Sequence, residues 1–190
     1  MDKHLINLHM NMLFQLITKY KYDINSDRIG PDIPFTHWRL HFKKKMLILC
    51  KKKFGNFSDS AQFRPGAYAI GCSKIFIGNK VVIRPGCMLF GESKSLDFSI
   101  IIENDVLIGS GVHIYVNNHN FDRTDIPIIE QGHYPVKPVV LRKGCWIGAN
   151  AIILPGVEIG ENTVIGAGSI VTKSFPKGVV AAGNPAKVIA

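Results

Sequence analysis

An aliphatic residue recurs at every sixth position from Leu141 to Val171, and this period constrains the fold more than any other feature of the chain. Three positions after each aliphatic residue stands a glycine or an asparagine, the residue types that best tolerate a left-handed backbone conformation. A small residue follows each of them. A turn every six residues, with an aliphatic side chain pointing inward from each short side, predicts a parallel β-helix.

Three sets of positions define this repeat. The aliphatic residues are Leu141, Ile147, Ile153, Ile159, Ile165 and Val171. The turn residues are Gly144, Asn150, Gly156, Asn162 and Gly168. The small residues are Cys145, Ala151, Val157, Thr163 and Ser169. Because all three sets keep the same step, the pattern is specific and not a chance run of apolar residues.

The six-residue step also extends toward the N-terminus, with interruptions. It is kept by two further sets of aliphatic residues, Ile77, Ile83 and Leu89, and Ile102, Ile108 and Ile114. Residues 92–101 and 115–140 break the register, so we interpret them as loops extruded from corners of the coil. Such loops are expected to carry function, because the repeats mainly form the scaffold. We therefore predict an all-β domain over residues 63–190, with an extruded loop at 115–140 and a C-terminal tail at 175–190.

Residues 1–62 form a separate N-terminal segment that we expect to be basic and partly helical. Apolar spacing predicts a helix over residues 1–20, and Gly30, Pro31 and Pro34 indicate a connector. Lysines 43–45 and 51–53 bracket the apolar run 46–50. This cluster is compatible with a solvated flank, with attraction of a polyanionic substrate, or with an anionic membrane, where each basic residue contributes about 1 kcal/mol.

Composition limits the class of protein. A chain of 190 residues with 46% hydrophobic residues suits one domain with a short appendage. The formal charge of +9 does not indicate a nucleic-acid partner, because no helix-turn-helix, RNA-binding or zinc pattern accompanies it. Four cysteines without paired spacing predict buried, reduced thiols. We see neither a secretory signal nor an apolar run of about 20 residues, so we expect a cytoplasmic protein, with membrane association at the inner face left open.

Three runs in the repeat region carry a family resemblance. They are Trp146–Ala151, Val164–Lys173 and Ala182–Ile189. In this order they resemble the hexapeptide-repeat acyltransferases, in the branch of galactoside, maltose, nodulation-factor and polysaccharide O-acetyltransferases, over about residues 65–190. The resemblance implies a left-handed parallel β-helix, a homotrimer, acetyl-CoA as donor without a metal, and active sites between neighbouring subunits. The usual right-handed crossover rule would have predicted the opposite hand.

The resemblance also implies a catalytic residue, His119, at the point where the register breaks into the long loop. In the similar acetyltransferases a histidine at this point deprotonates the acceptor hydroxyl. A sugar hydroxyl is a poor nucleophile, and an imidazole that titrates near neutrality can accept its proton. Without the resemblance, the same histidine would be read as a surface or capping residue. We assign substrate-binding roles to Arg84, His113, Asn118 and Asp122, and we note that His133 lies on the same loop.

Donor binding is carried over from the family position by position. The residues expected to bind acetyl-CoA are Trp146, Gly148, Ala149, Gly166, Ala167, Thr172, Lys173 and Lys187. The resemblance sets the indole beside the pantetheine arm, for which it offers a flat apolar surface. The small residues match positions where backbone groups bond the pantetheine amides, and the remaining three lie toward the nucleotide end. A lysine at position 187 supplies charge without the two-pronged contact of an arginine.

Arg84 departs from the galactoside acetyltransferases, which have an asparagine at this point that contacts the sugar. Arg84 is suited to an acidic sugar, a phosphate-linked glycan or a protein carboxylate, so free galactosides are not favoured. We therefore expect an O-acetyltransferase acting on a sugar hydroxyl in the synthesis of a surface polysaccharide such as capsule or O-antigen.

Three alternatives stay open from the sequence. An amino-sugar N-acetyltransferase would need less help from a base. A metal enzyme like the γ-class carbonic anhydrases needs three histidines, two of them five residues apart, whereas His113 and His119 are six apart. A non-catalytic β-helix scaffold is the third alternative.

Overall fold

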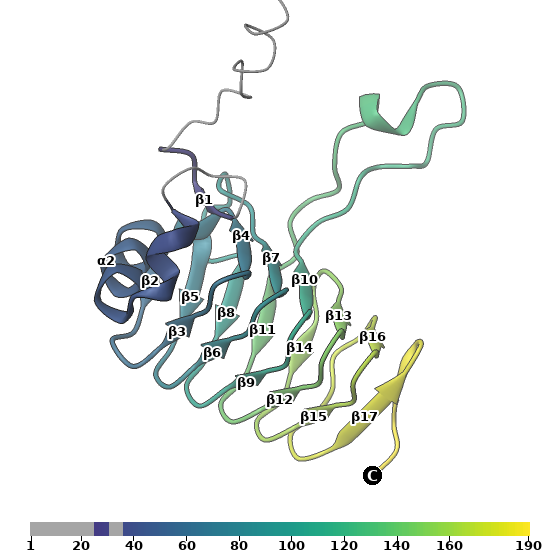
Figure 1. The fold of residues 1–190 in the computed structure, drawn as a ribbon. Coiled ribbons are helices and arrows are strands. Elements are labelled where there is room, and N and C mark those ends of the chain that lie inside the picture. The colour runs from purple at the N-terminus through teal and green to yellow at the C-terminus, as the bar shows by residue number, and fades with distance from the viewer. Residues whose placement is uncertain (1–24, 31–35) are drawn as a thin grey trace, which may run out of the picture.

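The computed structural model describes residues 25–30 and 36–190, and it shows a triangular coil of short strands in three sheets (Figure 1). The helix predicted over residues 1–20 lies outside the described residues. We call the three sheets A, B and C. In each turn the chain contributes one strand to sheet B, then one to sheet C, then one to sheet A. Neighbouring strands are parallel except β1 with β4 and β17 with β18, which are antiparallel. The all-β class predicted from the period is confirmed.

The strands are two to four residues long, as the six-residue step requires. Sheet A contains β1 (Arg28–Ile29), β4 (Tyr68–Ile70), β7 (Met88–Phe90), β10 (His113–Tyr115), β13 (Ile152–Ile153) and β16 (Ile170–Val171). Sheet B contains β2 (Asn56–Phe57), β5 (Ile75–Ile77), β8 (Ile100–Ile102), β11 (Val139–Leu141) and β14 (Glu158–Ile159). Sheet C contains β3 (Gln62–Phe63), β6 (Val82–Ile83), β9 (Leu107–Ile108), β12 (Trp146–Ile147), β15 (Val164–Ile165), β17 (Val180–Gly183) and β18 (Ala186–Val188).

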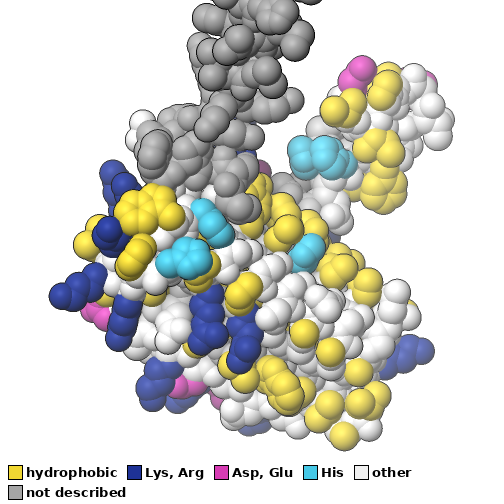
Figure 2. Space-filling model, viewed as in Figure 1, with side chains coloured by type: hydrophobic (Ala, Val, Ile, Leu, Met, Phe, Trp, Pro, Cys, Tyr) yellow, Lys and Arg dark blue, Asp and Glu magenta, His cyan; other side chains and the backbone are white. Residues whose placement is uncertain are grey.

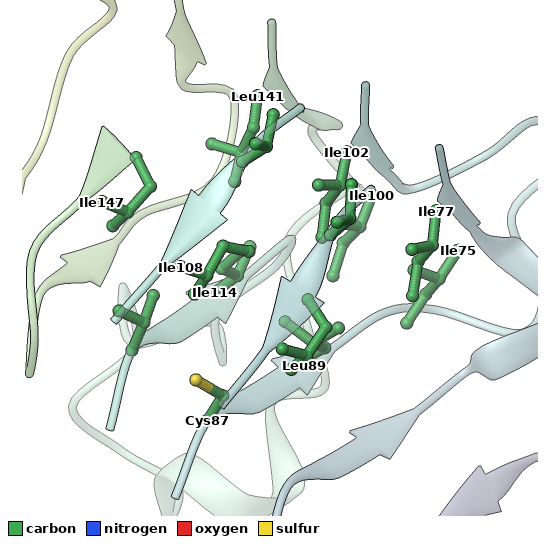
Figure 3. Close-up of a cluster of buried hydrophobic side chains, with 14 of the residues drawn as sticks. Ile75, Ile77, Cys87, Leu89, Ile100, Ile102, Ile108, Ile114, Leu141 and Ile147 are labelled. Atoms are coloured by element: carbon green, nitrogen blue, oxygen red, sulfur yellow. The ribbon is translucent and has the colours of Figure 1, made fainter. Parts of the chain in front are cut away.

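The repeated aliphatic residues form the core of the coil (Figure 3). All six from Leu141 to Val171 have an exposed fraction of 0%, as do the two earlier sets. The five predicted turn residues all have positive φ angles, between 53° and 80°. Both halves of the repeat therefore have the roles predicted for them: the turn residues permit each corner, and the aliphatic residues fill the interior.

Every insertion into the coil lies at the corner where the chain passes from sheet A to sheet B. The first contains the 3₁₀ helix η2 (Cys72–Lys74), the second is residues 91–99, and the third is residues 116–138. We call residues 116–138 the arm; it projects from the end of β10 and carries η3 (Ile128–Glu130) near its tip (Figure 1). Both long insertions are slightly shorter than predicted, because β8 and β11 return to the coil at positions 100 and 139.

The coil begins before the predicted boundary at residue 63, because β2 already pairs with β5. Ahead of it lie the 3₁₀ helix η1 (His37–His41) and the helix α2 (Lys43–Lys53), within the segment expected to be basic and partly helical. The helix α2 packs against β2 and β3, and its buried residues are Met46, Leu49 and Cys50. The helix thus covers the N-terminal end of the coil. At the other end, β17 and β18 extend sheet C through the predicted tail.

The four cysteines are buried and free, as predicted for reduced thiols. Burial raises the pKa of the Cys145 thiol to about 12, because a thiolate would lose its hydration inside the coil. No helix among the described residues is long and apolar enough to cross a membrane.

The two residues of β14 offer a direct test of this core. Ile159 points inward and is fully buried, whereas Glu158 points outward and pairs with Arg142. Ile159→Ala should lower the free energy of unfolding by about 2–5 kcal/mol, since it leaves a cavity. Glu158→Ala should cost about 1 kcal/mol or less, since exposed ion pairs contribute little. Chemical denaturation at one protein concentration measures both, and equal losses would contradict the assigned interior.

Candidate active site

The arm is braced by its own backbone hydrogen bonds. Three of them, 2.8–2.9 Å long, join its two branches: Lys137 to Val116, Tyr134 to Asn118, and Asn120 to Gly132. His119 and His133 face each other across this ladder, with ring centroids 4.0 Å apart. Both histidine side chains are exposed to solvent in the single chain. His119 is therefore held on a structured support, together with Asn118, which was predicted to bind substrate.

Asp122 is bonded to the opposite branch of the arm. Its carboxylate accepts a hydrogen bond of 2.6 Å from the Tyr134 hydroxyl. This bond raises the pKa of the Tyr134 phenol, since the anionic acceptor stabilises the protonated form. The Tyr134 ring also packs edge-on against Phe121, with centroids 5.6 Å apart. This contact supports a role for Asp122 in positioning the loop, in addition to the substrate-binding role predicted from the sequence.

The corner between sheets C and A carries four of the predicted donor-binding residues. Gly148 and Ala149 occupy it between β12 and β13, and Gly166 and Ala167 occupy it one turn later. A Cβ atom on Gly148 would lie 2.5 Å from the Ala167 nitrogen, which is too close for any side chain. Glycine is therefore required here by the stacking of the turns, and not only by a ligand.

Two backbone donors remain available at this corner. The N–H groups of Gly148 and Gly166 bond carbonyl groups of the following turn, at 2.7 and 2.8 Å. Those of Ala149 and Ala167 donate to no acceptor within the described part of the chain. Because the two alanines are one turn apart, their N–H groups should be separated by about the spacing of neighbouring strands, near 4.8 Å. A thin ligand that carries amide carbonyls fits this arrangement.

Arg84 lies at the same corner as Ala149, two turns earlier. It follows β6, is exposed, and precedes Pro85 and Gly86. Trp146, on the outer side of β12, is 50% exposed and so presents an indole face next to this corner.

His113 lies on the outer face of sheet A, between the two corners. Its Nδ1 atom is 3.3 Å from the Tyr115 hydroxyl. The Tyr115 ring stacks on Phe90, with centroids 4.7 Å apart and an interplanar angle of 4°. His113 is thus part of an aromatic surface at the root of the arm and not part of the arm itself.

Comparisons with known proteins bear on this geometry. Residues 138–173 match the family described as bacterial transferase hexapeptide (six repeats). Over 155 residues the chain is 34% identical to the galactoside O-acetyltransferase of Escherichia coli K12, covering 82% of this chain and 72% of that protein. It is 30% identical over 144 residues to the putative colanic acid biosynthesis acetyltransferase WcaF of the same strain, covering 70% and 78%. A galactoside acetyltransferase solved in complex with coenzyme A aligns with a TM-score of 0.69 and 31% identity, over 80% of this chain and 76% of that one.

The chain belongs to the hexapeptide-repeat transferase family. It is accordingly an acyltransferase, and its coil is the left-handed parallel β-helix of that family. The resemblance seen in the sequence is confirmed. Within the described residues, no three His, Cys, Asp or Glu side chains are grouped as a metal centre requires.

In this hexapeptide-repeat transferase, the predicted site residues do not meet within one chain. His119, Asn118 and Asp122 are on the arm, at the corner between sheets A and B. The four residues of the stacked turns that were predicted to bind the donor lie at the corner between sheets C and A, across the width of sheet A. Thr172 and Lys173 follow β16 and so belong to the corner of the arm, and Lys187 lies on β18 at the end of sheet C.

Two features near these residues were missed in the sequence. Arg64 stands one turn before Arg84, and each is followed by Pro and Gly, so the same corner carries two exposed arginines. The repeat of Arg-Pro-Gly at a spacing of 20 residues was the available signal. The stacked Phe90 and Tyr115 were also missed, because their strands are 25 residues apart and only the insertion length brings them into register.

The bond between Tyr134 and Asp122 predicts how the arm is stabilised. Tyr134→Phe should increase amide hydrogen exchange and tryptic cleavage at Arg123 in the arm, while the global unfolding midpoint stays the same. Tyr115→Phe removes a hydroxyl on sheet A and serves as the matched control, with no change expected at Arg123. Equal arm protection in both variants would show that the hydroxyl of Tyr134 does not brace the arm.

Proposed function

We propose that this hexapeptide-repeat transferase moves the acetyl group of acetyl-CoA to a hydroxyl of a glycan, with His119 as general base. The observation that carries the proposal is the position of His119, exposed on a braced arm in a chain that shares the family of the O-acetyltransferases. A base must be held firmly to accept a proton in one geometry, yet must be open to a large acceptor. The arm offers both properties.

The proposed reaction includes two proton transfers, one from the acceptor hydroxyl to His119 and one from His119 to the leaving thiolate. His119 takes the proton of the acceptor hydroxyl as its oxygen attacks the thioester carbon. The new C–O bond forms, the oxyanion is stabilised by a backbone N–H, and the C–S bond then breaks. The imidazolium returns the proton to the leaving thiolate of CoA. No acyl-enzyme is required, because donor and acceptor are bound together.

We assign the donor to the corner that carries Ala149 and Ala167. Their free N–H groups suit the amide carbonyls of a pantetheine arm, and Trp146 offers it an apolar wall. Neither alanine has a side chain large enough to obstruct such a ligand. Lys187, exposed on β18 at the end of the same sheet C, supplies positive charge that suits the phosphates of the nucleotide end. Lys173 lies at the corner of the arm, so it could serve only a donor bound by another chain.

We infer that the working form is a homotrimer in which the arm of one chain reaches the donor corner of the next. The separation of the two corners by sheet A supports this, since a single chain leaves His119 away from the donor. The arm also exposes large apolar side chains that a neighbouring subunit would cover. These are Phe121 at 62%, Ile128 at 55% and Ile129 at 82%.

We propose that the acceptor is an acidic or phosphate-linked glycan used in the synthesis of a surface polysaccharide. Arg64 and Arg84 at the donor corner, with His113 on the adjacent face, support an anionic acceptor. The similarity to the colanic acid protein WcaF supports the polysaccharide class. The four buried, reduced thiols support a cytoplasmic location.

Replacement of His119 tests the base. Purified protein is incubated with acetyl-CoA and a panel of sugars, nucleotide sugars and glycans, and thiol release is followed. We expect His119→Ala to lower kcat by about 10²–10⁴-fold, the usual contribution of a general base, with little change in KM for acetyl-CoA. His41→Ala, an exposed histidine in η1, is the matched control and should retain full activity.

Other outcomes of the same assay would contradict the proposal. Full activity of His119→Ala on an amino sugar would indicate N-acetylation, since an amine needs less help from a base. Absence of acetyl-CoA binding to the unaltered protein would refute the donor assignment and favour a scaffold.

Co-expression of two inactive variants tests the shared site. His119→Ala disables the arm, and Ala167→Leu should obstruct the donor corner without disturbing the core, because Ala167 is exposed. If arm and corner come from different subunits, random mixing in a cyclic trimer restores about a quarter of the sites. Mixed protein that stays inactive, although each variant still assembles, would show that one chain supplies both parts.

A further inference from the structure

The helix α2 and the preceding turn present a basic and apolar surface that neither the coil nor the proposed reaction uses. Residues 36–53 contain seven lysines and arginines and no acidic residue. Figure 2 shows these cationic side chains gathered over the end of the molecule that α2 covers. We call one part of this exposed surface the docking face. It consists of Trp38, Phe42, Lys44, Lys45, Ile48, Lys51 and Lys52.

The outer side of α2 places one apolar residue at the centre of four lysines. Ile48 is 70% exposed, although an isoleucine of a helix usually faces the core. Lys44 and Lys45 stand four and three positions before it, and Lys51 and Lys52 stand three and four positions after it. Residues at these spacings are neighbours on a helix surface, so the lysines surround the isoleucine. All four lysines are exposed, and Lys51 also pairs with Asp59.

Two exposed aromatic rings continue the docking face beyond the helix. Trp38 is 43% exposed and Phe42 is 53% exposed, and their ring centroids are 5.9 Å apart. The ammonium group of Lys45 lies 4.3 Å from the centre of the Trp38 ring and 5.0 Å from that of Phe42. The apolar and cationic groups are therefore intermixed at one place, and not segregated onto separate surfaces.

The lysines of the last turn suit the negative end of the helix dipole, but the stability of α2 does not account for the lysines of its first turn. Lysines 43–45 occupy the first turn, where the helix dipole is positive and cationic side chains are unfavourable. That turn has no acidic residue, and Phe42 provides no side-chain cap. An anionic partner at this end of the helix would relieve the repulsion, bond the free N–H groups and neutralise the lysines together.

From these observations we infer that the docking face binds the surface of an anionic lipid membrane. Lysines meet the lipid phosphates, and Ile48, Phe42 and Trp38 enter the boundary between headgroups and acyl chains. Tryptophan favours that boundary because its ring is apolar and its N–H is polar. A soluble polyanion would use the lysines but would leave the three apolar side chains in water, so the membrane accounts for more of the surface.

This orientation leaves the donor corner free. The helix α2 packs on β2 and β3 in the first turn of the coil, whereas Ala149 and Ala167 lie in later turns. The coil would stand with its N-terminal end on the membrane, and its C-terminal turns would face away. The inference rests on the docking face alone and does not depend on the proposed acetyl transfer.

Vesicle co-sedimentation tests the inference with the full chain. We expect binding to vesicles of phosphatidylcholine mixed with phosphatidylglycerol, and little binding to phosphatidylcholine alone. Lys44→Gln, Lys45→Gln and Lys52→Gln together should lower the partition coefficient about 100-fold, since each basic residue near an anionic surface contributes a factor of about five. The matched control changes Lys94, Lys143 and Lys177, which are also exposed but lie outside the docking face, to Gln, and it should bind almost normally. Added salt should weaken binding.

A spectroscopic readout separates insertion from charge attraction alone. The chain has two tryptophans, so Trp146→Phe leaves Trp38 as the reporter. Its emission should shift to shorter wavelength, and its quenching by a soluble quencher should fall, when anionic vesicles are added. Ile48→Ser should lower the partition coefficient several-fold without changing the helical circular dichroism signal.

Four outcomes would overturn the inference. They are no binding to anionic vesicles at low salt, equal loss of binding in the two triple variants, unchanged Trp38 emission on bound vesicles, and full competition by a soluble anionic polysaccharide with no emission shift. The last would identify a glycan-binding surface in place of a membrane-binding one.

Discussion

The close stacking of successive turns is the constraint on which the rest of this molecule depends. At Gly148 and Gly166 the next turn approaches so closely that an added Cβ would lie 2.5 and 2.8 Å from its atoms. Such contact is possible only if each side of the triangle has the same length and each corner bends the same way. The buried aliphatic residue and the left-handed turn residue of every repeat satisfy these two conditions.

The same constraint determines where function can be added. Extra residues are accommodated only at a corner where the chain leaves one sheet and returns in register to the next. All three insertions use the corner between sheets A and B, and the other two corners keep their regular stacking within residues 56–171. The regular corner between sheets C and A therefore forms a straight edge with evenly spaced backbone groups, suited to an extended ligand. The irregular corner carries the arm, whose shape is not dictated by the coil.

The sequence alone was sufficient to predict the features that repeat, and it was insufficient to predict those that do not. Ile147 and Asn150 could be assigned to the core and to a turn because each follows a period. The pairing of His119 with His133 depends on backbone hydrogen bonds inside the arm, and no repeat in the sequence predicts it. Several donor-binding candidates lie close together in the sequence, yet the chain crosses a whole side of the triangle between Ala167 and Lys173. Six residues in the sequence are a short separation, but in this fold they span two corners.

An aromatic surface lies between the two separated corners. Phe90, Tyr115 and His113 occupy the outer face of sheet A, which one chain leaves partly open to solvent. If His119 is the base and the donor binds at the opposite corner, as proposed, the two can act together only if this face is spanned by a bound acceptor or covered by a second chain. Aromatic rings serve both purposes, since they pack against protein and stack on the apolar faces of sugar rings. In a trimer that shares its sites, forming the interface and forming the acceptor pocket are the same step, so assembly itself would determine which glycans reach His119.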